Sequence, residues 1–240
     1  MPAQSLDLII ADPPYKLEMP EKTGVDDLLS SKKIKLVNED WDKYTLESYI
    51  DFSEEWIASA MKLLKPTGSL FIFGSYHNIG LVNYVLQKQK IMMINDIAWY
   101  KRNAVPNLAC RRLTASYETI LWAAPGKKYR FNYADMKDYP DDAIHKRGKQ
   151  MRNVWDIPTN SAESVAHPTQ KPTRLYERII KMTTGKGDTI LDPFGGSGTL
   201  GIAASRTGRN SIMIEQSSTY VDVITERMTK EMESHALFDG

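Results

Sequence analysis

The sequence predicts an α/β fold built on a mostly parallel, doubly wound sheet. Three observations support this fold class. Short apolar runs alternate along the chain with segments of helical periodicity, which is the pattern of repeated strand–helix units. A glycine-rich turn lies between one such strand and the helix that follows it. The length of 240 residues, with 42% hydrophobic and 25% charged residues, suits one globular domain and excludes a wholly disordered chain.

The elements can be predicted in order along the chain. Residues 6–11 form an apolar run that ends at two prolines, as buried strands often do. Residues 16–44 are polar and predict a long loop. Thr45 offers a helix N-cap, and apolar residues then recur at helical spacing, among them Trp56, which we expect in the core. Residues 66–68 predict a turn. Further strands are expected at 69–73, 94–100, 118–123, 189–191 and 211–215, and further helices at 79–89, 172–184, 197–206 and 219–233.

The charge is balanced overall but segregated along the chain. The formal net charge is +1, yet residues 101–152 carry twelve Lys and Arg against five Asp and Glu, a local balance of +7. Residues 125–166 show little periodicity and hold much of this excess. A basic stretch of this kind attracts a phosphate backbone, although a merely solvated basic surface explains the asymmetry equally well.

Cysteine and histidine usage narrows the class of protein further. One cysteine, Cys110, excludes an internal disulfide and a zinc site made of several cysteines. The four histidines show no metal-ligand spacing, so we predict no metal site. No apolar run approaches the ~18 residues that a membrane span needs. These features predict a protein of the reducing cytoplasm that does not bind a membrane.

The most informative motif is the glycine-rich turn at residues 192–199, Asp-Pro-Phe-Gly-Gly-Ser-Gly-Thr. Its glycines allow close approach of a ligand to the backbone, and the following helix offers free N–H groups. Glu215, at the end of the next predicted strand, can accept hydrogen bonds from a ribose diol. Gly196, Gly198 and Gly201 also fit G-x-G-x-x-G, but the 25 residues after Glu215 leave no space for a second mononucleotide half. We therefore expect a nucleoside site; a ligand-free tight turn is the alternative.

A second motif, Asp12-Pro13-Pro14-Tyr15, follows the first predicted strand. The prolines stiffen the loop and remove two N–H donors, so a carboxylate, a carbonyl and an aromatic ring are held close together. This set suits an exocyclic amine on a flat heterocycle, with two acceptors for the amine and a ring that stacks on the base. The alternative is a rigid turn with a surface tyrosine.

A third motif, His-Pro-Thr-Gln-Lys-Pro at residues 167–172, precedes a predicted helix. By itself it predicts only a solvated turn at the start of that helix. The order of the three motifs is more specific than any one of them. Together they resemble the beta class of DNA amino-methyltransferases of bacterial restriction–modification systems, which use S-adenosylmethionine. The variant Asp-Pro-Pro-Tyr, rather than Ser-Pro-Pro-Tyr, favours N6-adenine over N4-cytosine as the target.

The resemblance implies a circularly permuted methyltransferase fold. Residues 1–125 and 167–240 would form the catalytic domain, and residues 126–166 a small target-recognition insertion. The amine of the target base would be bound by Asp12 and the Pro13 carbonyl, in a loop that Pro14 stiffens, with Tyr15 stacked on the base. The implied cofactor residues are His167, Thr169, Lys171, Asp192, Phe194, Gly196, Ser197, Gly198, Thr199 and Glu215. The implied contacts with double-stranded DNA are Lys101, Arg102, Arg111, Arg112, Lys146 and Arg147.

The resemblance also implies a homodimer and a cognate restriction endonuclease as partners. Two alternatives stay open at the level of function. One is an N4-cytosine enzyme. The other is a DNA-binding relative that has lost catalysis, because members of this class carry a further strand with a Gly-Asp-Cys-like turn ahead of the strand at 6–11, whereas Met1 stands only a few residues before it. A nicotinamide-dependent oxidoreductase would leave Asp12–Tyr15 unexplained.

Overall fold

The computed structural model describes residues 1–14, 44–104, 106, 110–111, 113–140, 144–159 and 170–238, with side chains placed as far as residue 234. The predicted loop at 16–44 therefore lies almost wholly outside the described residues. Among the helices that are described, none combines the length and the apolar character needed to cross a membrane.

The described strands form one sheet in the order β5-β3-β4-β2-β1-β6-β7. Their bounds are β1 (Leu6–Ala11), β2 (Leu64–Gly74), β3 (Met92–Tyr100), β4 (Tyr117–Ala124), β5 (Val154–Asp156), β6 (Thr189–Asp192) and β7 (Asn210–Met213). Among these described strands four pairings are parallel, and the β2–β4 and β3–β4 pairings are antiparallel. The prediction of a mostly parallel sheet is confirmed.

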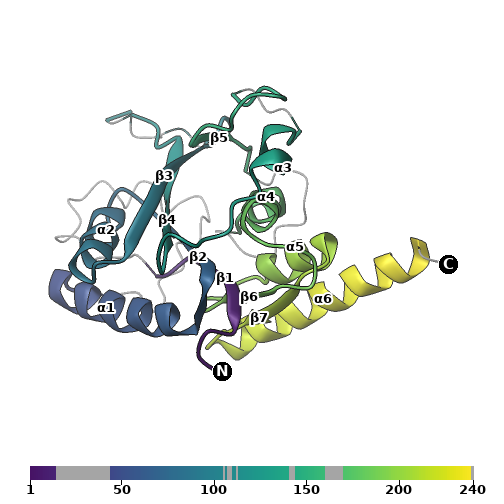
Figure 1. Cartoon of the computed structure of the whole chain (residues 1–240), viewed down its shortest axis with the longest axis horizontal. Helices are drawn as coiled ribbons and strands as arrows, with labels where there is room; N and C mark the ends of the chain where they lie inside the picture. Colours follow the sequence, from purple (N-terminus) through teal and green to yellow (C-terminus); the bar gives the residue numbers. More distant parts are fainter. Residues whose placement is uncertain are drawn as a thin grey trace.

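Helices cover both faces of the sheet, as parallel sheets require. The helices are α1 (Leu46–Leu63), α2 (Ile79–Lys88), α3 (Tyr133–Lys137), α4 (Thr173–Thr183), α5 (Thr199–Thr207) and α6 (Ser218–Phe238). In Figure 1, α1 and α2 lie on one side of the sheet, and α4, α5 and α6 on the other. Strand β1 contributes side chains to the hydrophobic cores on both faces of the sheet. Leu8 and Ile10 belong to the core beneath α4 and α5, whereas Ile9 belongs to the core beneath α1 and α2.

Most element boundaries agree with the sequence prediction, including the N-cap Thr45, whose hydroxyl accepts from the Ser48 amide at 3.2 Å. The turn predicted at residues 66–68 is wrong, because those residues belong to β2. Leu6 pairs with Leu64, but Leu8 pairs with Ser69, so β2 carries three residues more than β1 over this step. The proline and glycine are accommodated in this irregular part of the strand.

The structure adds two short elements that the sequence did not reveal within residues 126–166. Helix α3 packs against α4, and β5 extends the sheet by pairing with β3. The buried guanidinium of Arg178 on α4 lies between the rings of Tyr139 and Trp155, 5.0 and 5.2 Å from their centroids. This contact ties Tyr139 and the strand β5 to α4. Elements of three to five residues are too short to show a hydrophobic period, which is why the sequence missed them.

Candidate active site

The candidate site lies where β1 and β6 end side by side. These strands are parallel neighbours, with Ile9 opposite Leu191, so the loops that follow them emerge at the same edge of the sheet. The chain leaves β1 toward β2 on one side and leaves β6 toward β7 on the other. Open α/β sheets bind ligands in the crevice at such a reversal of strand order. The fold therefore brings the Asp12 motif and the glycine-rich turn together.

Asp12 occupies the first position after β1, followed by the buried Pro13. The ammonium of Lys171, from the motif that precedes α4, lies 2.7 Å from Asp12 Oδ2. Lys171 is only 6% exposed, so this ion pair is shielded from water. The solvated turn that the third motif predicts by itself is therefore wrong at Lys171. Tyr15, His167 and Thr169 lie outside the described residues.

Lys171 also contacts a second carboxylate, which the sequence did not assign to the site. Its ammonium lies 3.5 Å from Glu118 Oε2, and Lys101 contacts the other oxygen of Glu118 at 2.9 Å. Burial acts to raise the pKa of Glu118, but the charges of Lys171 and Lys101 outweigh it and lower that pKa. Asp12, Lys171, Glu118 and Lys101 thus form a row of alternating charge, which we call the charge row.

The backbone and ring contacts of Lys171 link the charge row to the glycine-rich turn. The Lys171 carbonyl accepts a hydrogen bond from the hydroxyl of Thr199, the first residue of α5, at 3.4 Å. The Lys171 ammonium also lies 5.5 Å from the centre of the Phe73 ring, which stacks on Tyr176 of α4. A single residue ahead of α4 therefore touches both halves of the candidate site.

The glycine-rich turn has the backbone geometry that its sequence predicts. Gly196 and Gly198 have φ values of +50° and +78°, in the left-handed region that side chains disfavour. Gly198 is the N-cap of α5, so the free N–H groups of that helix open at the turn. Ser197 is buried within it, and its carbonyl accepts a hydrogen bond from Arg227 of α6. The turn therefore presents backbone N–H groups at the edge of the sheet where Asp12 also lies.

Two carboxylates flank this turn. Glu215 lies two residues beyond β7 and accepts hydrogen bonds from the amides of Gly196 at 2.8 Å and Ser217 at 2.9 Å. A carboxylate has about four lone-pair sites, so these two bonds leave capacity for ribose hydroxyls. Asp192 is buried at the end of β6, and burial raises its pKa to about 7, against the lowering effect of the Phe194 amide.

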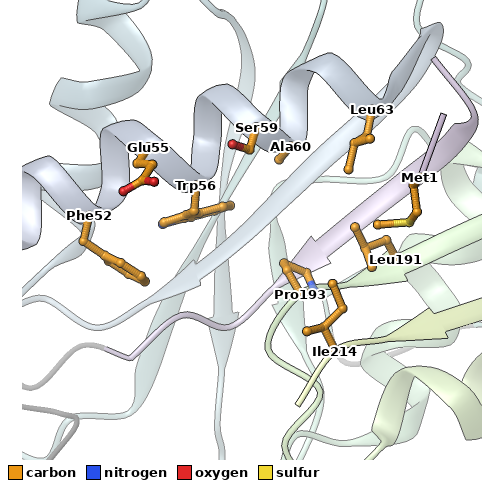
Figure 2. A pocket seen from close by; sticks show the side chains of 10 residues that line it. All are labelled: Met1, Phe52, Glu55, Trp56, Ser59, Ala60, Leu63, Leu191, Pro193 and Ile214. Atoms are coloured by element: carbon orange, nitrogen blue, oxygen red, sulfur yellow. The ribbon is translucent and has the colours of Figure 1, made fainter. Parts of the chain in front are cut away.

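An apolar groove of about 320 Å³ runs beside the turn, between α1 and the strand ends. Figure 2 shows Phe52 and Trp56 of α1 on one wall, and Leu191, Pro193 and Ile214 on the other. The next residue of the turn, Phe194, packs edge-on against Trp56, with 5.4 Å between the ring centroids. The centroid of the Phe52 ring lies 6.1 Å from that of Phe194.

Trp56 is therefore only half-buried, and it forms a wall of the groove as well as packing against the core. The sequence predicted Trp56 in the core and assigned Phe52 to no site. The only signal in the sequence is the spacing of these two aromatic residues, four positions apart on one helix, which does not distinguish a groove wall from a core.

The basic residues predicted to contact DNA fall into two groups. Lys101 belongs to the charge row, and Arg102 makes a two-pronged ion pair with Asp156 at 2.9 and 2.7 Å. Arg111, Lys146 and Arg147 are exposed, and Arg112 lies outside the described residues. Among the residues that the structure describes, no cluster of His, Cys, Asp and Glu is suited to hold a metal ion.

Comparisons with known proteins agree with this geometry. Residues 6–226 match the family model for DNA methylases of the N6/N4 type. The chain is 41% identical to the Type II methyltransferase M2.DpnII of Streptococcus pneumoniae over 98% of this chain and 87% of that protein. It is also 41% identical to the Type II methyltransferase M2.LlaDCHI of Lactococcus lactis subsp. cremoris, over 95% of this chain and 83% of that protein. Its structure resembles that of M1.HpyAVI in complex with S-adenosylmethionine, with a TM-score of 0.64, 29% identity, and coverage of 93% of this chain and 88% of that one.

Proposed function

Because the chain belongs to the N6/N4 DNA methylase family, we propose that it transfers a methyl group from S-adenosylmethionine to the N6 amine of adenine in double-stranded DNA. The protein is a DNA methyltransferase that uses S-adenosylmethionine. Adenine as the target is supported by the motif Asp12-Pro13-Pro14-Tyr15, whose first residue is Asp rather than Ser.

The single observation that carries the proposal is that Asp12 and the glycine-rich turn directly follow two neighbouring parallel strands, β1 and β6, and so lie at the same edge of the sheet. The chain's residues fit the cofactor. Glu215 offers acceptors for the ribose hydroxyls, the start of α5 offers N–H groups, and the buried carboxyl of Asp192 suits the ammonium of the methionine portion. We propose that Phe194, Gly196, Ser197, Gly198 and Thr199 line this pocket.

The amine of adenine is a weak nucleophile because its lone pair is delocalised into the ring. We propose that the Asp12 carboxylate and the Pro13 carbonyl accept hydrogen bonds from the two N–H groups of that amine. Acceptors on both hydrogens favour a pyramidal nitrogen with its lone pair directed at the methyl donor. The bound cofactor supplies an electrophilic methyl group on a positively charged sulfur. The protein's contribution is to fix the amine and the donor in line and to stabilise the positive charge that develops on the nitrogen.

The base must leave the duplex to reach Asp12, at a cost of a few kcal/mol. We propose that the basic segment at 101–152, with Arg111, Lys146 and Arg147 exposed, offsets this cost through phosphate contacts. Residues 126–166 are the proposed target-recognition insertion, and Tyr15 is the proposed stacking partner of the base. A homodimer and a cognate endonuclease remain predictions.

Transfer of labelled methyl from S-adenosylmethionine to unmethylated bacterial DNA tests the proposal. The expected product is N6-methyladenine, identified by mass spectrometry of the digested nucleosides. Label found only in N4-methylcytosine would instead assign the protein to the cytosine type. Calorimetry with S-adenosylmethionine distinguishes an active methyltransferase from a DNA-binding relative without catalysis. Such a relative would bind DNA but not the cofactor.

A further inference from the structure

We propose that Lys171 and Glu118 act together as positioning residues for Asp12. Lys171 fixes the orientation of the Asp12 carboxylate, and Glu118 balances the charge of Lys171 where the methyl group is transferred. This inference rests on the proposed function, because it assigns to Asp12 the binding of the target amine.

The geometry supports the orienting role of Lys171. Its ammonium lies 2.7 Å from Asp12 Oδ2, a distance typical of a charge-assisted hydrogen bond. Lys171 is itself held in place, because its carbonyl accepts from Thr199 and its ammonium lies over the Phe73 ring. A carboxylate that accepts one such bond keeps further lone pairs for a substrate amine. Lys171 can therefore fix the plane of the carboxylate without displacing the substrate from it.

The role of Glu118 follows from the charge that moves in the reaction. The N6 lone pair forms a bond to the methyl carbon while the carbon–sulfur bond breaks and its electron pair stays on sulfur. The positive charge passes from sulfur to N6, which then loses a proton to water, so the products are methyladenine, the neutral thioether and one proton. A buried lysine beside this path opposes the positive charge unless a carboxylate balances it. Glu118, 3.5 Å from the Lys171 ammonium, provides that carboxylate, and Lys101 holds it in turn.

Other titratable groups surround the charge row. Tyr49 on α1 and Tyr176 on α4 both interact electrostatically with Asp12. Burial raises the pKa of Tyr49 to about 12 and that of Tyr176 well above its usual value, so both stay neutral in the working range. Asp192 on β6 has a pKa of about 7, which burial and the charge of Asp12 raise and the charge of Lys171 lowers, so the loss of Lys171 raises that pKa as well. Glu118 is not among the groups that shift it, so a Glu118 substitution does not reverse that change. A test must therefore compare pH profiles between variants rather than interpret a single profile.

The test is the pH dependence of kcat, at saturating DNA and cofactor, for four proteins: wild type, Lys171→Gln, Glu118→Gln and the double variant. In Lys171→Gln, two carboxylates lose the cation that they share, and one of them retains a proton to higher pH. We expect kcat to fall and the acidic limb of the profile to move up by about one pH unit or more. In the double variant only one carboxylate of the pair remains, so the limb should return toward the wild-type position.

Glu118→Gln alone should keep the acidic limb at or below its wild-type position while lowering kcat about tenfold, because the charge of Lys171 is then less well balanced. Lys171→Arg should leave the acidic limb of the pH profile at its wild-type position, because the positive charge is retained. Its kcat should be lower, because the geometry of the guanidinium differs from that of the ammonium. If Lys171→Gln does not fold, as judged by thermal unfolding, Lys171→Arg and Glu118→Gln still decide the question: a kcat unchanged from wild type in both would overturn the inference.

Lys65→Gln provides the matched control. Lys65 of β2 pairs with Asp7 at 2.8 Å, and Asp7 lies on β1 at the end away from the site. The loss of Lys65 should leave the pH profile of kcat unchanged. A wild-type limb position in Lys171→Gln, or a failure of the double variant to move it back, would overturn the inference. The absence of methyl transfer by the wild-type protein would overturn the proposed function instead.

Discussion

The ammonium of Lys171 lies 2.7 Å from a carboxylate oxygen of Asp12, although 159 positions separate the two residues in the sequence. The contact forms because β1 and β6 are neighbours and α4 leads into β6 on the face above them. It joins two of the three motifs that the sequence presents and makes the Asp12 corner part of a preorganised, largely buried network. This network and the surfaces around it can be tested by substitution.

Asp12→Ala should abolish detectable methyl transfer, with a loss of at least about 100-fold in kcat, because the amine loses a preorganised acceptor. Cofactor affinity should stay within a few-fold, since the proposed cofactor contacts come from the glycine-rich turn and Glu215. Labelled methyl transfer and calorimetry with S-adenosylmethionine measure the two effects separately. An Asp12→Ala protein with near wild-type turnover would contradict the role assigned to Asp12.

Gly198→Ala should lower stability and weaken cofactor binding. Its φ of +78° costs a side chain about 1–2 kcal/mol. The new methyl group would also lie 3.1 Å from Ile224 Cγ1. Gly80→Ala is the control, because Gly80 lies within α2 with open space where the methyl group would go. That change should stabilise the protein by up to about 1 kcal/mol. Urea unfolding of both variants tests the opposite signs, and equal effects would refute the backbone argument.

Asp192 should make the stability of the cofactor-free protein depend on pH. Burial raises its pKa in the folded protein from 3.8 to about 7, so the folded state favours the protonated carboxyl. Relative to an ionised carboxylate, the protonated Asp192 therefore stabilises the folded protein. This contribution to the free energy of unfolding is full below about pH 4 and is lost as the pH rises through about 7. Asp192→Asn keeps an oxygen for the Phe194 amide but removes this titration. Its stability relative to wild type should rise by about 2–4 kcal/mol between pH 4 and pH 8. A difference that does not change with pH would exclude the effect.

Lys146→Ala and Arg147→Ala should weaken DNA binding without changing cofactor affinity. If each side chain contacts a phosphate, each substitution should reduce the slope of log affinity against log salt by about 1. Fluorescence anisotropy at several salt concentrations measures that slope. Lys230→Ala on α6 removes an exposed charge elsewhere and should leave the slope unchanged. A Lys146 or Arg147 variant that behaves like Lys230→Ala would remove that residue from the proposed DNA surface.

The long, periodic parts of this protein could be predicted from its sequence. The apolar run of β1, the helix α1 with its cap at Thr45 and the turn around Gly198 each carry a local signal, because strand alternation, capping and positive φ depend on near neighbours. The order of the three motifs likewise indicates the family, since each motif is a short string of residues that can be identified without the fold. The short elements α3 and β5 carried no such signal.

Tertiary structure alone decided how the site is assembled. Glu118 looks like an ordinary strand residue in the sequence, and Lys171 like part of a solvated turn. The pairing of Lys171 with both Asp12 and Glu118 depends on three distant segments meeting at one edge of the sheet. The sequence by itself determined which chemical groups this protein can use, because motifs are local. The order of the strands decided which of those groups form ion pairs with one another and which are buried. Strand order is a property of the whole fold that no local pattern specifies.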